Sequence, residues 1–158
     1  MQFKETFLKG VYVIELERKE DERGFFARTF CQREFQDHGL NPNLAQCNIS
    51  CNKMKGTLRG MHFQVAPFEE AKLVCCVQGA VFDVIIDIRP DSSTFRKYFA
   101  IELTADAHKA VYVPEGFAHG FLTLMPETRV FYQMSEFYAP GKARGFRWND
   151  PAFAVKWQ

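Results

Sequence analysis

The chain has 158 residues, of which 47% are hydrophobic and 25% are charged, and its net charge is +1. This is the balance of an ordinary globular protein, and it lacks the basic excess with which proteins bind nucleic acid electrostatically. The 17 phenylalanines are spread along the whole chain. Because phenylalanine favours strands and fills large cores, they indicate a protein rich in β-sheet.

Short segments of alternating hydrophobic and polar residues follow one another along the chain, and this period of two is typical of strands. The expected strands span residues 11–16, 25–30, 45–52, 57–64, 72–78, 81–88, 98–103, 110–113, 116–124 and 129–134. Turn-forming groups such as Asp21-Glu-Arg-Gly24 separate them. One short helix is expected at 32–38, where Gly39 can form a left-handed cap and Pro42 follows.

Many short strands and a single short helix predict an all-β fold, either a sandwich or a closed barrel, and a jelly roll is one such solution. The near absence of helix excludes Rossmann and TIM-barrel folds. No linker or repeat divides the chain, so residues 1–158 are expected to form one domain. Its site is expected in the interior or at the mouth of the strand assembly.

The cysteines and the N-terminal segment indicate in which cellular compartment the protein is expected. The odd number of cysteines argues against a secreted disulfide framework, and Cys47-x3-Cys51 lacks the paired spacing of a zinc site, so the thiols are expected to be structural or incidental. The charged segment 1–5 has no apolar signal core, and no uncharged run is long enough to span a membrane. The sequence predicts a cytoplasmic protein without a membrane partner.

Several ionisable residues lie on strands that are expected to face the interior. Regular alternation places Arg59 and His62 on opposite faces of strand 57–64, but a bulge at Gly60 would turn both toward one cavity. Asp83 lies in an apolar strand, where an unpaired carboxylate is unfavourable. Such buried polarity exceeds what folding needs and indicates a functional site, to which we also assign Lys72, His119 and Tyr132.

Two kinds of site fit these residues. A metal cupin needs several histidines and a carboxylate, and His62 and His119 could serve, but no His-x-His pair is present. A proton-transfer site needs a base, an acid and a cation for the developing oxyanion, which His62, Tyr132 and Lys72 can supply. The residues favour proton transfer without a metal or another cofactor.

The motifs around these residues resemble the dTDP-4-dehydrorhamnose 3,5-epimerase family over nearly the whole chain. The most specific matches are Leu58-Arg-Gly-Met-His-Phe-Gln64 and Pro114-Glu-Gly-Phe-Ala-His-Gly-Phe121; others lie at 21–26, 72–74, 81–84, 87–89, 93–95 and 148–151. The resemblance implies a cupin-type jelly roll (double-stranded β-helix) and a homodimer that exchanges N-terminal strands. It also implies metal-independent epimerisation at C3, C5 or both of a nucleotide-linked 4-keto-6-deoxyhexose in deoxysugar or polysaccharide biosynthesis.

Carried over residue by residue, the resemblance makes His62 the base that removes the proton alpha to the C4 ketone. Lys72 would stabilise the enolate oxygen, and Tyr132 would return a proton on the opposite face. Arg59 resembles the residue that holds the diphosphate. Two further groups are implied: Asp83 and His119 as a supporting pair beside the sugar, and Arg23, Gln46, Asn48 and Tyr138 as nucleotide contacts.

Three departures from the family pattern bear on activity and specificity. The family continues past the final tryptophan with an Asp that pairs with the catalytic His, and the 158 residues hold no counterpart. His62 is therefore expected to be less well oriented, unless another carboxylate substitutes, and activity to be slow or selective. Arg28 stands where the family has a Glu that accepts from thymine N3–H, and because Arg only donates, a CDP-sugar would suit it better than a dTDP-sugar. Cys47 and Ile49 replace the family's Asp and His.

Other functions stay open at this point. A ketoisomerase would run the same proton transfer but move the carbonyl. A non-catalytic nucleotide-sugar binding protein would fit the absent Asp, and a metal cupin would require a bound metal. A GDP-linked substrate is a further possibility for the nucleotide.

Overall fold

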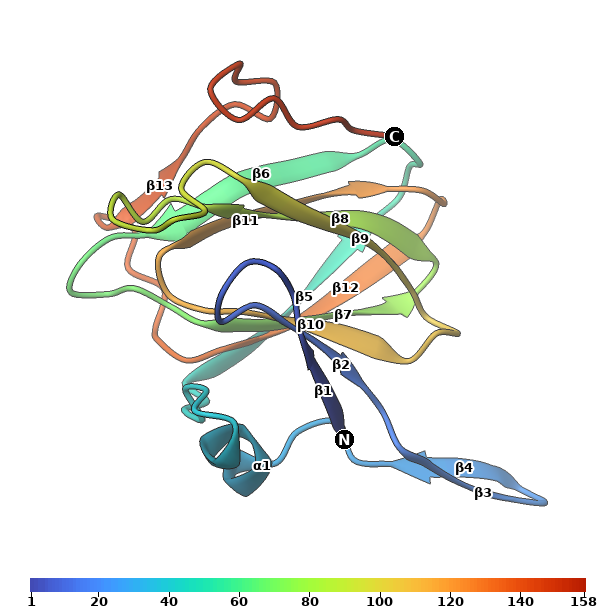
Figure 1. Cartoon of the computed structure of the whole chain (residues 1–158). Coiled ribbons are helices and arrows are strands. Elements are labelled where there is room, and N and C mark those ends of the chain that lie inside the picture. The colour runs from blue at the N-terminus through green and yellow to red at the C-terminus, as the bar shows by residue number, and fades with distance from the viewer.

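The computed structural model describes all 158 residues, and its main body consists of two antiparallel sheets that face each other (Figure 1). The first sheet has the order β1 (Gln2–Glu5), β2 (Tyr12–Glu15), β10 (Lys109–Val113), β7 (Lys72–Gln78), β12 (Thr128–Met134) and β5 (Gln46–Asn52). The second has the order β13 (Ala143–Gly145), β6 (Leu58–Gln64), β11 (Phe117–Thr123), β8 (Ala80–Asp87) and β9 (Tyr98–Thr104). A separate hairpin of β3 (Arg18–Asp21) and β4 (Gly24–Ala27) projects away from both sheets (Figure 1).

The predicted all-β jelly roll with one short helix is confirmed, as two facing sheets. Helix α1 (Gln32–Asp37) is followed by Gly39 at φ +68°, the expected left-handed cap. No helix in the structure has the length and apolar character needed to cross a membrane.

Three observed strands were not expected from the sequence, and one expected strand extends beyond the observed one. Strands β1, β3 and β13 are short and mostly exposed, so their residues carry no regular alternation. The strand expected at 25–30 ends at Ala27 as β4. Beyond it the chain turns, and the ring of Phe30 packs against Phe35 of α1 with ring centroids 4.8 Å apart.

The buried side chains form three layers. The largest cluster lies between the two sheets and includes Val74, Ile85 and Phe121. A second cluster, centred on Phe35, packs α1 against the outer face of the first sheet. In the third, the C-terminal segment lies over the outer face of the second sheet (Figure 1). There Trp157 packs against the cluster that contains Val84.

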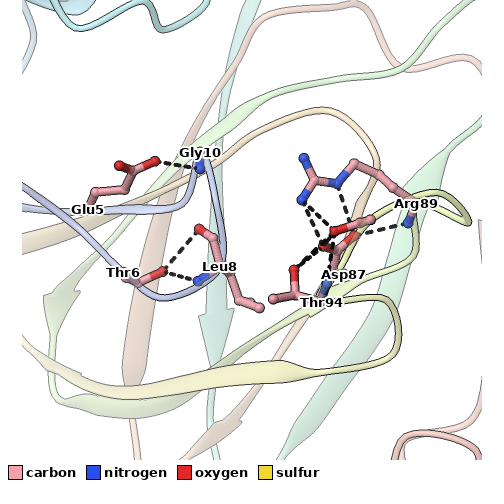
Figure 2. Close-up of polar contacts among 8 residues, drawn as sticks. Glu5, Thr6, Leu8, Gly10, Asp87, Arg89 and Thr94 are labelled. Atoms are coloured by element: carbon pink, nitrogen blue, oxygen red, sulfur yellow. Dashed lines mark hydrogen bonds and ion pairs between the residues drawn. The ribbon is translucent and has the colours of Figure 1, made fainter.

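A buried carboxylate, Asp87, organises the loop after β8 (Figure 2). It accepts hydrogen bonds from the Arg89 guanidinium at 2.7 and 3.0 Å and from the Ser92 and Thr94 hydroxyls at 2.6 Å. Burial acts to raise the pKa of Asp87, but these donors together outweigh it and hold the pKa well below its usual range. Since Arg89 also stacks on Phe117 at 4.3 Å, the network fixes the start of β11.

Candidate active site

A β-bulge at Gly60 determines where the polar side chains of β6 point. His119 of β11 pairs with His62, whereas Phe121, two residues on, pairs with Arg59, three residues back, so β6 holds one extra residue. Gly60 has φ +114°, and a Cβ there would lie 2.6 Å from the Gly120 Cα. The predicted bulge is confirmed, and it brings Arg59 and His62 to one cavity.

This cavity has a volume of about 280 Å³ and is bordered by strands of both sheets. His62 and His119 come from the second sheet, whereas Lys72 and Tyr132 come from the first. The complete lining is Asn48, Ile49, Ser50, Arg59, His62, Lys72, His119, Gly120, Phe121, Tyr132 and Met134. No three His, Cys, Asp or Glu side chains of the chain converge as ligands for a metal ion.

Asp83 and His119 form a buried pair behind the cavity. The His119 Nε2–H donates to Asp83 Oδ2 at 2.8 Å, and the Asp83 side chain is fully buried. The second oxygen, Asp83 Oδ1, has no hydrogen-bond partner. The predicted pair therefore exists, but only its histidine lines the cavity.

Lys72 is paired with a carboxylate that the sequence reasoning missed. The Lys72 Nζ lies 2.9 Å from Glu70 Oε1, and the exposed fractions of the two side chains are 9% and 5%. Glu70 lies before the start of β7, so the alternation of hydrophobic and polar residues along that strand did not single it out. The spacing of two residues to Lys72 was the one available signal, because residues two apart share a face of an extended chain.

His62 lies at the rim of the cavity, partly open to solvent, and none of the hydrogen bonds within the chain involves its ring. Burial lowers the pKa of the His62 imidazole below 6.5, and the charge of Lys72 lowers it further. The charges of His119 and Arg59 act in the same direction, and that of Glu70 opposes them. At neutral pH the imidazole is therefore mainly uncharged and able to accept a proton.

Tyr132 lies across the cavity on the other sheet. Burial raises the pKa of its hydroxyl well above the usual value of 10, and the charge of Asp83 adds to this effect. The hydroxyl is therefore protonated at neutral pH and able to donate. The ring stands edge-on to His119, with ring centroids 6.3 Å apart.

Of the predicted substrate-binding residues other than Arg59, one lines the cavity, and two, Gln46 and Tyr138, do not. Asn48 lines it, and Gln46 pairs in register with Met134, which also lines it. The Tyr138 backbone N–H donates to Gln46 Oε1 at 2.8 Å. Arg59 is held by Asn52, whose Oδ1 accepts from the Arg59 Nε at 2.7 Å.

Two predicted substrate contacts lie elsewhere in the chain. Arg23 occupies the turn of the projecting β3–β4 hairpin, where its guanidinium pairs with Asp21 at 2.6 Å. Arg28 follows β4 and pairs with Glu34 of α1 at 2.9 Å. Neither lines the cavity of its own chain.

A larger cavity of about 530 Å³ lies on the outer face of the first sheet. Ten of its 15 lining residues are hydrophobic, among them Phe25 of the hairpin, Leu73 and Phe131. Strand alternation explains the separation, because Lys72 and Tyr132 point inward while their neighbours Leu73 and Phe131 point outward. None of the predicted site residues lines this second cavity.

Comparisons with known proteins agree along the whole chain. The family model for dTDP-4-dehydrorhamnose 3,5-epimerase matches residues 5–158. The chain is similar to the dTDP-4-dehydrorhamnose 3,5-epimerase of Sinorhizobium fredii, with 38% identity over 157 residues that cover 99% of this chain and 80% of that protein. The structure of the enzyme of that name from Elizabethkingia anophelis is similar with a TM-score of 0.95 and 40% identity, covering 100% of this chain and 86% of that one. The corresponding structure from Bacillus anthracis, solved with TDP and PPi bound, has a TM-score of 0.95 and 38% identity, covering 99% of this chain and 89% of that one.

Proposed function

Because the chain belongs to the dTDP-4-dehydrorhamnose 3,5-epimerase family, we propose that it epimerises a nucleotide-linked 4-keto-6-deoxyhexose at C3, C5 or both. The observation that carries the proposal is the placement of His62 and Tyr132 on different sheets that border one cavity. Inversion of a carbon requires a base on one face of the sugar and an acid on the other. The two sheets supply these two sides.

In the proposed reaction, neutral His62 removes the proton from the carbon next to the C4 ketone. The electron pair of the C–H bond moves into the ring carbon–carbon bond, and the carbonyl oxygen becomes an enolate. The Lys72 ammonium stabilises that negative charge in a partly desolvated cavity. The Tyr132 hydroxyl then donates a proton to the same carbon from the opposite face, and exchange with solvent restores both groups.

The other polar residues of the cavity position the substrate. We assign the diphosphate to Arg59, since its guanidinium suits bidentate contacts with phosphate oxygens. The Asp83–His119 pair presents a fixed imidazole edge beside the sugar, and Gln46, Asn48 and Tyr138 contact the nucleotide side. The B. anthracis relative binds TDP, which favours a dTDP-sugar, whereas Arg28 in place of a Glu favours a CDP-sugar.

We further propose a cytoplasmic homodimer in which the hairpin of each copy reaches the site of the other. Phe26 of the hairpin is 75% exposed, and the adjoining cavity on the outer face of the first sheet is apolar. An apolar surface of this kind is typical of a protein interface. Such an arrangement would carry Arg23 and Arg28 to a cavity that they do not reach in their own chain.

The test is a panel of dTDP-, CDP- and GDP-linked 4-keto-6-deoxyglucose incubated with the protein in deuterated water. Deuterium at C3, C5 or both, located by NMR, is the expected result, and His62→Ala should abolish it. His38→Ala is the matched control, because His38 caps the C-terminal end of α1 and does not line the cavity. A carbonyl that moves would indicate a ketoisomerase, and binding without any exchange would indicate a non-catalytic binding protein.

A further inference from the structure

The chain contains two buried side-chain polar atoms without a hydrogen-bond partner, and both lie beside the candidate active site. They are Asp83 Oδ1 and Glu70 Oε2. A buried, unpaired carboxylate oxygen destabilises a folded protein, so each such atom calls for an explanation. Asp83 already belongs to the pair with His119, but Glu70 has no role in the proposed reaction.

The position of Glu70 is defined by its ion pair with Lys72. The Lys72 ammonium makes one salt bridge, to Glu70 Oε1 at 2.9 Å, whereas Asp83, the other carboxylate near the cavity, pairs with His119. Lys72 shares the cavity with Arg59, whose positive charge would drive a flexible lysine away. Glu70 is therefore the counter-ion that keeps this ammonium in place.

The backbone around Glu70 is held on both sides. The Ala71 N–H donates to the Ser135 hydroxyl at 2.8 Å, and the Ser135 N–H donates to the Ala71 carbonyl at 2.9 Å. On the other side, the Gln64 side-chain amide donates to the Phe68 carbonyl at 2.9 Å. A carboxylate on a segment fixed in this way can orient its partner with little loss of precision.

We propose that Glu70 is a positioning residue that aims the Lys72 ammonium at the place where the enolate oxygen develops. This inference rests on the function proposed above. An ammonium has three N–H donors, so a single bond to Glu70 Oε1 leaves two for the substrate. A buried ion pair with one unpaired oxygen is a poor source of stability, which is why we assign it to function rather than to folding.

The test compares the exchange kinetics of Glu70→Gln, Lys72→Met, the double variant and Glu69→Gln. Loss of Lys72 should lower kcat by about 10²–10³-fold, the effect of removing one oxyanion-stabilising group. Glu70→Gln should lower kcat by roughly tenfold or more and leave KM within about twofold, because the carboxylate acts on the transition state through Lys72. In the double variant, Glu70→Gln should add nothing to the effect of Lys72→Met.

Glu69→Gln is the matched control, since Glu69 is exposed and its substitution changes the net charge equally. It should keep wild-type kcat. Glu70→Asp, which keeps the charge but is one methylene shorter, should give a kcat between those of the wild type and Glu70→Gln. If Glu70→Gln does not fold, Glu70→Asp replaces it as the test variant, and its kcat should still be below that of the wild type. A Glu70→Gln enzyme with full kcat, or effects that add in the double variant, would overturn the inference and leave the proposed function standing. Wild-type protein without exchange on any of the three nucleotide sugars would overturn the proposed function, and the role of Glu70 with it.

Discussion

Four side chains that can carry positive charge surround the candidate active site: Arg59, His62, Lys72 and His119. The proposed substrate brings a diphosphate, and the reaction creates an enolate, so positive charge is needed at both ends of the ligand. Burial lowers the pKa of His62, and the charges of Lys72, His119 and Arg59 lower it further, which keeps the imidazole in the form that can act as a base. The same positively charged residues are therefore expected to bind the substrate and to keep His62 uncharged.

This coupling predicts the pH dependence of the reaction. The base must be uncharged, and the pKa of His62 is lowered from 6.5. The acid limb of the pH profile, where kcat/KM falls as His62 is protonated, should therefore have its midpoint below pH 6.5. Substitution Lys72→Met removes a charge that lowers this pKa, and the acid limb should move to higher pH while the maximal rate falls. Rates measured from pH 4.5 to 8.5 test both statements. A limb that stays in place in Lys72→Met would mean that the limb reports a group other than His62.

At the scale of elements, the site depends on the irregular part of β6. A regular strand would point Arg59 and His62 to opposite faces, and one extra residue at Gly60 changes this. Gly60 and Gly120 lie back to back, since a Cβ on Gly120 would come within 2.8 Å of the Arg59 carbonyl. The bulge therefore needs glycine on both strands.

Substitution Gly60→Ala should disrupt the bulge and the site together. The positive φ and the contact with the Gly120 backbone should destabilise the fold by about 2 kcal/mol or more. Exchange activity should fall at least tenfold, because Arg59 and His62 would no longer both point into the cavity. Urea unfolding and the exchange assay measure the two effects. Gly141→Ala is the control, since a Cβ there meets nothing within 4 Å, and equal losses in both variants would contradict this account.

The loop after β8 is predicted to contribute stability that depends on pH. The pKa of Asp87 is depressed in the folded state, so its stabilisation is fully present above the unfolded-state value of about 4 and is lost as pH falls through the folded-state pKa. Asp87→Asn should lower the free energy of unfolding by about 3 kcal/mol at pH 7, because Arg89 loses its buried partner. The difference in the free energy of unfolding between Asp87→Asn and the wild type should become smaller below about pH 4. Asp91→Asn, at an exposed position in the same loop, is the control, and a constant difference across pH 3–7 would rule out this origin.

For the whole molecule, the first sheet separates two surfaces of different chemical character. Its inner face carries Lys72 and Tyr132, and its outer face carries Leu73 and Phe131 beside the apolar cavity. Strand alternation alone assigns these neighbours to opposite sides. We therefore expect catalysis on one face and subunit contact on the other.

The proposed exchange of hairpins can be tested by mixing two inactive proteins. His62→Ala removes the base, and Arg23→Ala removes the hairpin contact. If each site combines the cavity of one copy with the hairpin of the other, a mixed dimer contains one intact site. Random pairing should then restore about a quarter of wild-type activity after co-expression, because half of the dimers are mixed. Activity no greater than that of the separate variants would show that the hairpin serves its own chain or none.

Much of the fold and of the site could be predicted from the sequence, for identifiable reasons. The ten strands expected from alternation all form, because most of them bury one face, although the mostly exposed β4 was expected to run past its observed end at Ala27. His62, Lys72, His119 and Tyr132 meet at one cavity as expected. Strands β1, β3 and β13 escaped prediction because exposed pairs of short strands leave no pattern, and Glu70 did so because it lies in a loop beside an equally acidic neighbour.

The sequence by itself determined the all-β class, the family and the chemical identity of the site residues, because alternation and motif spacing are local properties of the chain. Only the tertiary structure decided which charges meet. It paired Lys72 with Glu70 and His119 with Asp83, and it brought His62 and Tyr132 from different sheets to one cavity. It also left Arg23 and Arg28 outside their own cavity. These outcomes depend on contacts between residues far apart or on loop conformation, which no periodicity in the sequence encodes.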